Sequence, residues 1–314
     1  MHDGVAGRSA HVPATIAVLV TSVLWGTTGF GASFAAPLGA VTIGAAAMGI
    51  GGAVLAASNW RKLPAVFRAP GATRLVLSGA VAICVFTLCF YGAMGLAGVA
   101  LGTIVTICSS PIFAGLLELF IDRQPLSGRW YVAAALAIAG GVLLVTGRGA
   151  GGGWMGADPS QLPAGVAVGL VAGAAYAVYA WLLGTLIKPT PRRRDGLDRS
   201  ATVAAILAVA AIPLLGFMAA SGGAQLLDPA VWPALLYLGI VPMAIGHALF
   251  GWSLAALSAS TVTLYTLLEP AVATLLAVFI IGERLTAAGW LGLLLVLLGV
   301  AVLGVTWRRR PRAA

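Results

Sequence analysis

Long apolar runs recur along the whole chain, and no other feature of the sequence restricts its fold as strongly. A helix of about 20 apolar residues spans the hydrocarbon core of a bilayer. Of the 314 residues, 60% are apolar and only 9% are charged, whereas about a quarter are charged in soluble domains. The sequence predicts an all-α membrane protein with ten transmembrane helices, near residues 13–31, 37–57, 74–96, 99–120, 129–147, 161–187, 200–220, 231–254, 259–281 and 287–306.

The runs are continuous rather than alternating, and this distinguishes helices from transmembrane strands. Strands of a membrane barrel alternate polar and apolar residues over segments of about ten residues. Here the runs consist mainly of Ala, Leu, Val and Gly, and helices of this kind satisfy their own backbone hydrogen bonds in lipid. The 42 glycines support the same interpretation, because small residues let membrane helices approach one another closely.

Basic residues gather in alternate loops, which gives the chain a direction in the membrane. If both termini lie in the cytoplasm, 16 of the 18 Lys and Arg residues fall on the cytoplasmic side, and only Arg148 and Arg284 fall outside. Cytoplasmic loops of membrane proteins are enriched in Lys and Arg. We therefore predict a multi-pass protein of the bacterial inner membrane with both termini cytoplasmic. The net charge of +9 then reflects orientation in the lipid bilayer rather than a surface that binds nucleic acid.

No motif points to a metal, a nucleotide or another cofactor. Cys84, Cys89 and Cys108 all lie in apolar runs, and neither their number nor their spacing resembles a disulfide framework or a metal site. The three histidines are not spaced as metal ligands either. The GxxxxGK phosphate-binding pattern does not occur in the sequence, so we expect no ATP hydrolysis within this chain and no cofactor.

The two halves of the chain resemble each other weakly, and two prolines carry most of the resemblance. Pro111 in SSPIFAGLLELFIDRQPLS and Pro270 in LEPAVATLLAVFIIGERLT lie inside otherwise continuous apolar runs, 159 positions apart. At the same offset Gly140 matches Gly299. Each half has five predicted helices, an odd number, so the second half must enter the membrane in the opposite direction. Inverted repeats of this kind are common in secondary transporters, whose substrate site lies near the membrane midplane between the repeats.

These features divide the chain into four segments. We expect a cytoplasmic tail at residues 1–12, a first five-helix repeat at 13–147, a second repeat at 148–306, and a basic cytoplasmic tail at 307–314. The longest hydrophilic stretch, residues 188–199, is predicted to be a basic cytoplasmic loop inside the second repeat. The fifth and tenth predicted helices are rich in glycine, which allows either a monomer or a homodimer held by a small-residue contact.

The chain resembles the drug/metabolite transporter superfamily, and within it the EamA-type bacterial exporters. The resemblance rests on the ten-helix pattern, on the segment LEPAVATLLAVFIIGERLT at residues 268–286, and on its weaker copy around Pro111. It covers about residues 13–306, although the copy has Arg123-Gln124 in place of Gly282-Glu283. Members of this family export amino acids, aromatic compounds, other metabolites or cationic drugs, so the resemblance implies transport without naming a substrate.

Polar and aromatic side chains within the apolar runs are the candidates for a substrate pathway. Such groups are costly in lipid and usually face the interior of the bundle or a water-filled cavity. Helical spacing places Trp25 and Thr28 on one face of their helix, and Tyr176 and Tyr179 on one face of theirs. The predicted substrate-binding residues are Trp25, Thr28, Tyr91, Thr106, Ser110, Tyr176, Tyr179, His247, Tyr265 and Glu269, and the predicted helix breaks are Pro111 and Pro270.

Several of these candidates also have a structural interpretation. A lone buried histidine such as His247 more often packs than carries a proton, although its titration range suits a relay. Buried aromatic residues also fill packing space or lie in the interfacial belts of the membrane. Glu269 has a structural alternative as a protonated group bonded to neighbouring helices. Glu118, near the cytoplasmic end of the helix at 99–120, is expected to pair with Arg123 or to form part of a gate.

The ten-helix inverted repeat predicts a secondary transporter that alternates access to a midplane cavity, and the family resemblance implies that it is an exporter. The predicted cavity has an aromatic wall with one carboxylate. Such a wall suits a small zwitterion whose ammonium meets Glu269 or an aromatic face. Amino acids with aromatic or apolar side chains are therefore expected, with cationic drugs as the alternative. An intramembrane enzyme would need catalytic groups on facing helices, and only His247 with Ser109 or Ser110 is available. A passive channel is the third class.

Overall fold

The computed structural model of the protein describes residues 3–147, 159–189, 196–282 and 284–304. Several predictions concern residues outside these ranges. They are the start of the predicted second repeat with Arg148, the middle of the basic loop, Glu283 within the family segment, and the basic C-terminal tail.

Within the described ranges, ten apolar helical spans confirm the predicted fold class. The first half contains α1 (Asp3–Gly26) with α2 (Thr28–Ser33), α3 (Ala40–Asn59), α5 (Ala72–Ala97), α6 (Val99–Phe120) and α7 (Gly128–Thr146). The second half contains α8 (Leu162–Ile187), α9 (Arg199–Gly222), α10 (Trp232–Leu238) with the π-helix η5 (Gly239–Ile245) and α11 (Gly246–Leu254), α12 (Ala259–Tyr265) with α13 (Leu268–Leu276) and the π-helix η6 (Ala277–Ile281), and α14 (Ala287–Gly304).

The first helix begins earlier than the apolar pattern predicts. α1 starts at Asp3, inside the segment expected as a tail, and continues through Pro13. Hydropathy reports only the part of a helix that lies in lipid, so it does not detect a polar extension of the same helix. α1 is followed by the short helix α2 after Thr27, whose hydroxyl donates to the Leu24 carbonyl at 2.6 Å.

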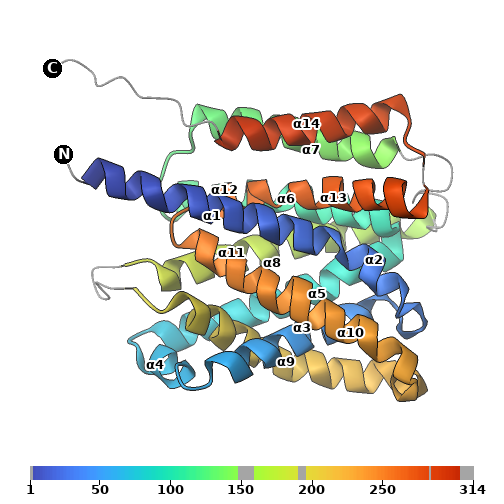
Figure 1. Cartoon of the computed structure of the whole chain (residues 1–314), viewed down its shortest axis with the longest axis horizontal. Coiled ribbons are helices and arrows are strands. Elements are labelled where there is room, and N and C mark those ends of the chain that lie inside the picture. Colours follow the sequence, from blue (N-terminus) through green and yellow to red (C-terminus); the bar gives the residue numbers. More distant parts are fainter. Residues whose placement is uncertain (1–2, 148–158, 190–195, 283, 305–314) are drawn as a thin grey trace.

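The helices of the two halves interleave. α3 packs against α9, α5 against α8 and α1 against α11, so that each pair joins a helix of the first half to one of the second. α7 and α14 form a further pair at the upper edge of Figure 1. Such interleaving is compatible with an inverted repeat, and the inverted relation between the halves stays a prediction.

Glycines allow α7 and α14 to approach closely. A Cβ on Gly140 would lie 2.7 Å from the Gly292 carbonyl oxygen, and one on Gly299 would lie 2.8 Å from the Ala133 carbonyl oxygen. A side chain at either position would therefore push the two backbones apart. The glycines considered above for a dimer contact thus serve a contact within one chain.

The two ends of the bundle differ in charge. One end, at the left of Figure 1, contains the start of α1, α4 (Leu63–Arg68) and the loops between α6 and α7 and between α8 and α9. We call this the basic end, because its described basic residues are Arg61, Lys62, Arg68, Arg74, Arg123, Arg129, Lys188 and Arg199. The opposite end, called the far end, contains the turn after α2 and the turn before α14, with Arg284.

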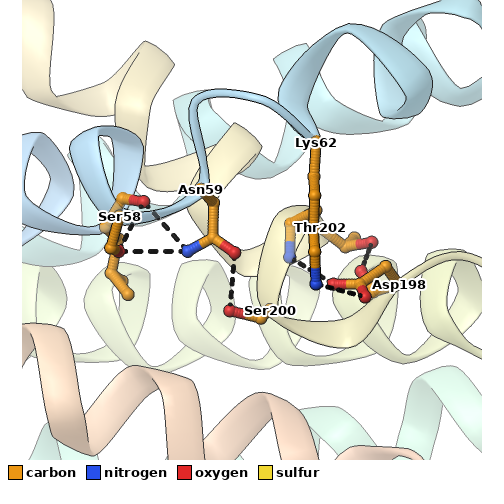
Figure 2. Close-up of polar contacts among 8 residues, drawn as sticks. Ser58, Asn59, Lys62, Asp198, Ser200 and Thr202 are labelled. Carbon is orange, nitrogen blue, oxygen red and sulfur yellow. Dashed lines mark hydrogen bonds and ion pairs between the residues drawn. The ribbon is translucent and has the colours of Figure 1, made fainter.

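A polar network joins α3 to α9 at the basic end (Figure 2). Ser200 Oγ donates to Asn59 Oδ1 at 2.8 Å, and Lys62 Nζ lies 3.1 Å from Asp198 Oδ2. Asp198 also caps α9, since its Oδ1 accepts from the Ala201 backbone N–H at 2.9 Å. Partial burial raises the pKa of Asp198, but the bonds from Ala201 and Lys62 outweigh this effect and hold the pKa below its usual value.

Candidate substrate-binding site

A cavity of about 470 Å³ lies between the two halves of the bundle. Its walls come from α1, α2, α3, α5, α6, α7 and α13. It reaches the surface at the far end, where its lining residues Ser33, Ala36 and Ala40 are exposed. This main cavity has the size of ligand sites in other proteins, which occupy roughly 300–1,000 Å³.

A smaller pocket of about 40 Å³, here called the head chamber, adjoins the main cavity. Trp25, Thr28, Phe90, Tyr91 and Glu269 line both spaces. On α3, α5 and α6, the residues that line only the head chamber lie nearer the basic end than those that line only the main cavity. The head chamber is therefore the inner end of the main cavity, in the middle of the bundle.

Glu269 lies where the ninth span is interrupted. α12 ends at Tyr265 and α13 begins at Leu268. Because Pro270 has no backbone N–H, the Thr266 carbonyl lacks its usual helical donor, and it accepts from the Glu269 N–H at 2.9 Å instead. This turn places Glu269 in the first turn of α13, where a helix N-terminus stabilises negative charge. The break predicted at Pro270 is present, and it brings a carboxylate to the wall of both spaces.

Pro111 does not break its helix, contrary to the prediction. α6 is continuous from Val99 to Phe120 and contains Pro111. The proline leaves the Ile107 carbonyl without its helical donor, and the Ser110 hydroxyl donates to that carbonyl at 2.9 Å. A carboxylate cannot donate in this way, so the matching Glu269 offers no such repair. The two matching prolines, Pro111 and Pro270, therefore have different consequences for their helices.

The π-helix η5 in the eighth span supports Trp25 and His247. Trp25 Nε1 donates to the Pro242 carbonyl at 2.9 Å, and His247 Nδ1 lies 2.9 Å from the Met243 carbonyl oxygen. The centroids of the Trp25 and His247 rings are 5.0 Å apart. π-Bulges expose backbone groups that a regular helix would use internally, and they occur frequently at functional sites. Here one such segment fixes two rings of the head chamber.

Aromatic rings form a large part of the head-chamber wall. The Tyr176 ring centroid lies 6.1 Å from that of Trp25 and 5.0 Å from that of Phe86. The Tyr91 ring occupies space that only a glycine at position 44 leaves open, because a Cβ on Gly44 would overlap the ring. Aromatic faces attract cations as well as apolar groups, so this wall suits a molecule that combines the two.

The structure brings part of the predicted site together. The predicted residues that line the main cavity or the head chamber are Trp25, Thr28, Tyr91, Tyr176, His247, Glu269 and Pro270. Thr106, Ser110, Tyr179 and Tyr265 line neither space and are buried in the bundle. Ser110, Tyr179 and Tyr265 lie nearer the basic end than the head chamber does. Helical spacing found the inward face of each helix but not the depth at which the cavity ends.

Sequence reasoning missed several wall residues of the head chamber. Phe86 and Phe90 lie one turn apart on α5 and stack with ring centroids 5.4 Å apart. Their four-residue spacing beside Tyr91 is a signal that could have found them. Met48 and Gly44 also line the chamber, but nothing in their stretch of alanine and glycine marks them as wall residues.

Between the head chamber and the basic end, a buried polar contact closes the bundle. Glu118 on α6 accepts from the Ser260 backbone N–H at 2.8 Å and from the Ser260 hydroxyl at 2.6 Å. Trp130 Nε1 on α7 donates to the Ser260 carbonyl at 3.2 Å. Glu118 is only 7% exposed, so these bonds are shielded from water. Glu118 therefore binds the start of α12 rather than Arg123.

A second contact at the same end is exposed to solvent. Trp181 Nε1 on α8 donates to Asp122 Oδ2 at 2.9 Å. Lys188 follows α8 at the same end. Burial lowers the pKa of the Lys188 ammonium, while the negative charges of Glu118 and Asp122 act in the opposite direction. The basic end is thus held by contacts between α6, α8 and α12.

Comparison with known proteins identifies the family. The chain is 32% identical over 303 residues to the protein named Uncharacterized transporter YwfM of Bacillus subtilis (strain 168), and the match covers 94% of this chain and 95% of that protein. The profile of the EamA-like transporter family matches residues 163–305. The chain belongs to this family. A solved crystal structure has the same fold, with a TM-score of 0.76 and 21% identity, over 93% of this chain and 96% of that chain.

Membership in the EamA-like family makes this protein a transporter of small molecules and not an enzyme. The ten apolar spans found among its described residues and its relative in Bacillus make it a multi-pass protein of the bacterial inner membrane. The serines considered for an intramembrane enzyme have other roles, since Ser109 Oγ donates to the Thr106 carbonyl and Ser110 Oγ to the Ile107 carbonyl within α6.

Proposed function

We propose that this EamA-family protein is a secondary transporter that exports small amphipathic molecules carrying a protonated amine beside an aromatic or apolar body. The observation that carries the proposal is the Glu269 carboxylate on the aromatic wall of a cavity between the two halves. Amino acids with aromatic or apolar side chains are the first candidates. Organic cations are the second, favoured because the described lining residues include no lysine or arginine to hold a substrate carboxylate.

Alternating access is the proposed mechanism. The main cavity reaches the surface at the far end, and the contacts of Glu118 with Ser260 close the basic end. If the basic end faces the cytoplasm, as the distribution of Lys and Arg predicts, this is the outward-open form, from which an exporter releases its substrate.

Each wall residue has a distinct role in the proposal. Glu269 attracts the substrate ammonium, and the Trp25 and Tyr176 rings attract it through their faces. The main cavity, lined largely by apolar residues, receives the substrate body. In a proton-coupled exporter, Glu269 would also exchange its proton for the substrate cation. In a facilitator it would act only as a ligand.

Counterflow in proteoliposomes tests this function. Labelled phenylalanine is measured with the wild type and with Glu269→Gln, each with and without a pH gradient. We expect saturable counterflow in the wild type and its loss in Glu269→Gln. Asp228→Asn is the matched control, because it alters a carboxylate that lines neither space. Equal rates for the wild type and Glu269→Gln in both conditions would remove Glu269 as ligand and as proton carrier, and flux that does not saturate would indicate a channel.

A further inference from the structure

We propose that the head chamber binds a primary ammonium group, and that His247 Nε2 accepts one of its N–H bonds while Glu269 accepts another. The transporter therefore selects primary amines over N-methylated and quaternary ones. This inference rests on the proposed function and adds the residue and the chemical rule by which the site distinguishes its substrates.

The threonines of the head chamber face it as hydrogen-bond acceptors. Their hydroxyl protons are directed to backbone carbonyls three or four residues earlier: Thr28 donates to Trp25 at 2.7 Å, Thr87 to Ile83 at 2.8 Å, and Thr266 to Thr263 at 2.7 Å. Each hydroxyl has one proton to donate and two lone pairs that accept. What these side chains retain for a ligand is therefore their acceptor capacity, which adds to that of the Glu269 carboxylate.

His247 presents a further acceptor. Nδ1 lies 2.9 Å from the Met243 carbonyl oxygen, which can only accept, so the neutral ring carries its proton on Nδ1. Nε2 then has a free lone pair, and this atom is buried without a hydrogen-bond partner among the described residues. A charged ring would place a second buried proton where no partner meets it. The His247 ring centroid lies 5.0 Å from that of Trp25 and 6.0 Å from that of Tyr179, and His247 lines the head chamber.

One donor at the head chamber, the Trp25 indole N–H, is already in use. Trp25 Nε1 donates to the Pro242 carbonyl at 2.9 Å. Apart from the Tyr91 and Tyr176 hydroxyls, the described wall offers only acceptors and apolar surface. Inside the head chamber this wall favours a group rich in N–H bonds over a carboxylate, so the carboxylate of an amino-acid substrate would lie with its body in the main cavity.

The number of hydrogen bonds sets the selectivity. An NH₃⁺ group brings three N–H donors to the acceptors of the head chamber. A trimethylammonium group carries the same charge but brings no donor. The substrate body remains in the adjoining main cavity.

A methylation series separates charge from hydrogen bonding. 2-Phenylethylamine and its N-methyl, N,N-dimethyl and N,N,N-trimethyl derivatives are tested as competitors and as substrates of counterflow in proteoliposomes at neutral pH. For the wild type we expect affinity to fall stepwise, with the primary amine binding at least about ten-fold more tightly than the trimethyl compound, the effect of losing one bond to a charged donor. Equal affinity across the series would overturn the inference but leave the proposed function standing. If no amine and no amino acid is transported, the proposed function fails as well.

Variants of His247 test whether this residue causes the selectivity for primary amines. We expect His247→Leu to weaken binding of the primary amine and to reduce the ten-fold selectivity, whereas His247→Gln, which retains an acceptor, restores part of it. His11→Leu is the matched control, because His11 is exposed and lines neither space. Unchanged selectivity in His247→Leu would overturn the role of Nε2. If that variant does not fold, the methylation series is compared between His247→Gln and the wild type. Equal affinities across the series in the wild type, together with an unaltered profile in His247→Gln, would contradict the proposal.

Discussion

Replacing Glu118 tests whether its contact with Ser260 holds the basic end of the bundle closed. The carboxylate accepts two hydrogen bonds, at 2.8 Å and 2.6 Å, and both lie out of water. A hydrogen bond to a charged group contributes about 1.5–3 kcal/mol. Glu118→Gln keeps one acceptor oxygen and loses the charge, so we expect the closed form to lose about the value of one such bond. This corresponds to a roughly 10- to 150-fold shift toward a form that is open at the basic end.

Cysteine labelling measures that shift. Ser110→Cys is introduced in a background that lacks the native cysteines Cys84, Cys89 and Cys108, and a membrane-impermeant maleimide is added from the basic end. Ser110 is fully buried and lies nearer the basic end than the head chamber, so labelling requires that end to open. We expect Glu118→Gln to accelerate labelling at least ten-fold, and Asp228→Asn to leave it unchanged.

A double-mutant cycle with Ser260→Ala identifies the partner. Ser260→Ala removes the hydroxyl bond and Glu118→Gln removes the charge that strengthens it, so the two effects should not add, and the coupling energy should exceed about 0.5 kcal/mol. Labelling at the wild-type rate in Glu118→Gln would refute the gate. Additive effects of the two substitutions would refute Ser260 as its partner.

Two further predictions concern the cavity wall and the basic end. Gly44→Ala should displace the Tyr91 ring, since the added Cβ would overlap it, at a cost of about 1–3 kcal/mol of strain. This variant should lower phenylalanine counterflow, whereas Gly95→Ala should not, because nothing lies within 4 Å of a Cβ added there. Equal counterflow rates in the two variants would contradict the packing argument. Asp198→Ala removes a helix cap and should lower the free energy of unfolding by about 1 kcal/mol at pH 7. Because the folded-state pKa of Asp198 lies below its usual value, this stability is present above about pH 4 and is lost as the pH falls through the folded pKa. Thermal unfolding in detergent should therefore show the wild type and Asp198→Ala converging in acid, and a difference independent of pH would exclude the ionised carboxylate as its source.

The sequence predicts the helices because lipid leaves the backbone few alternatives. A chain with ten apolar runs must form helices that satisfy their own hydrogen bonds, so the spans could be placed to within a few residues from composition alone. The polar extension of α1 before Pro13 and the π-helix over Gly239–Ile245 could not. Neither changes the apolar pattern, and both depend on how backbone groups are satisfied by neighbouring helices.

The candidate site could likewise be predicted only in part from the sequence. Trp25, Tyr176 and Glu269 stand out in the sequence because polar and aromatic groups are costly in lipid. Gly44 contributes to the same wall by leaving room for the Tyr91 ring, and a missing side chain has no signature in a glycine-rich helix. The depth of the cavity was also unpredictable, because it depends on which end of the bundle is closed rather than on residue type.

The unbroken α6 and the interrupted ninth span give the two halves alternative forms of one element. In α6 the Ser110 hydroxyl restrains the carbonyl freed by Pro111, while before Pro270 the chain has turned and opened. If the halves exchange these forms, Ser110 releases Ile107, α6 bends at Pro111, and the ninth span straightens. Ser110, Tyr179 and Tyr265, buried here, would then face a cavity that opens at the basic end. If the halves are inverted repeats, the protein would thus hold both positions of a two-state switch at once, one in each half of the chain.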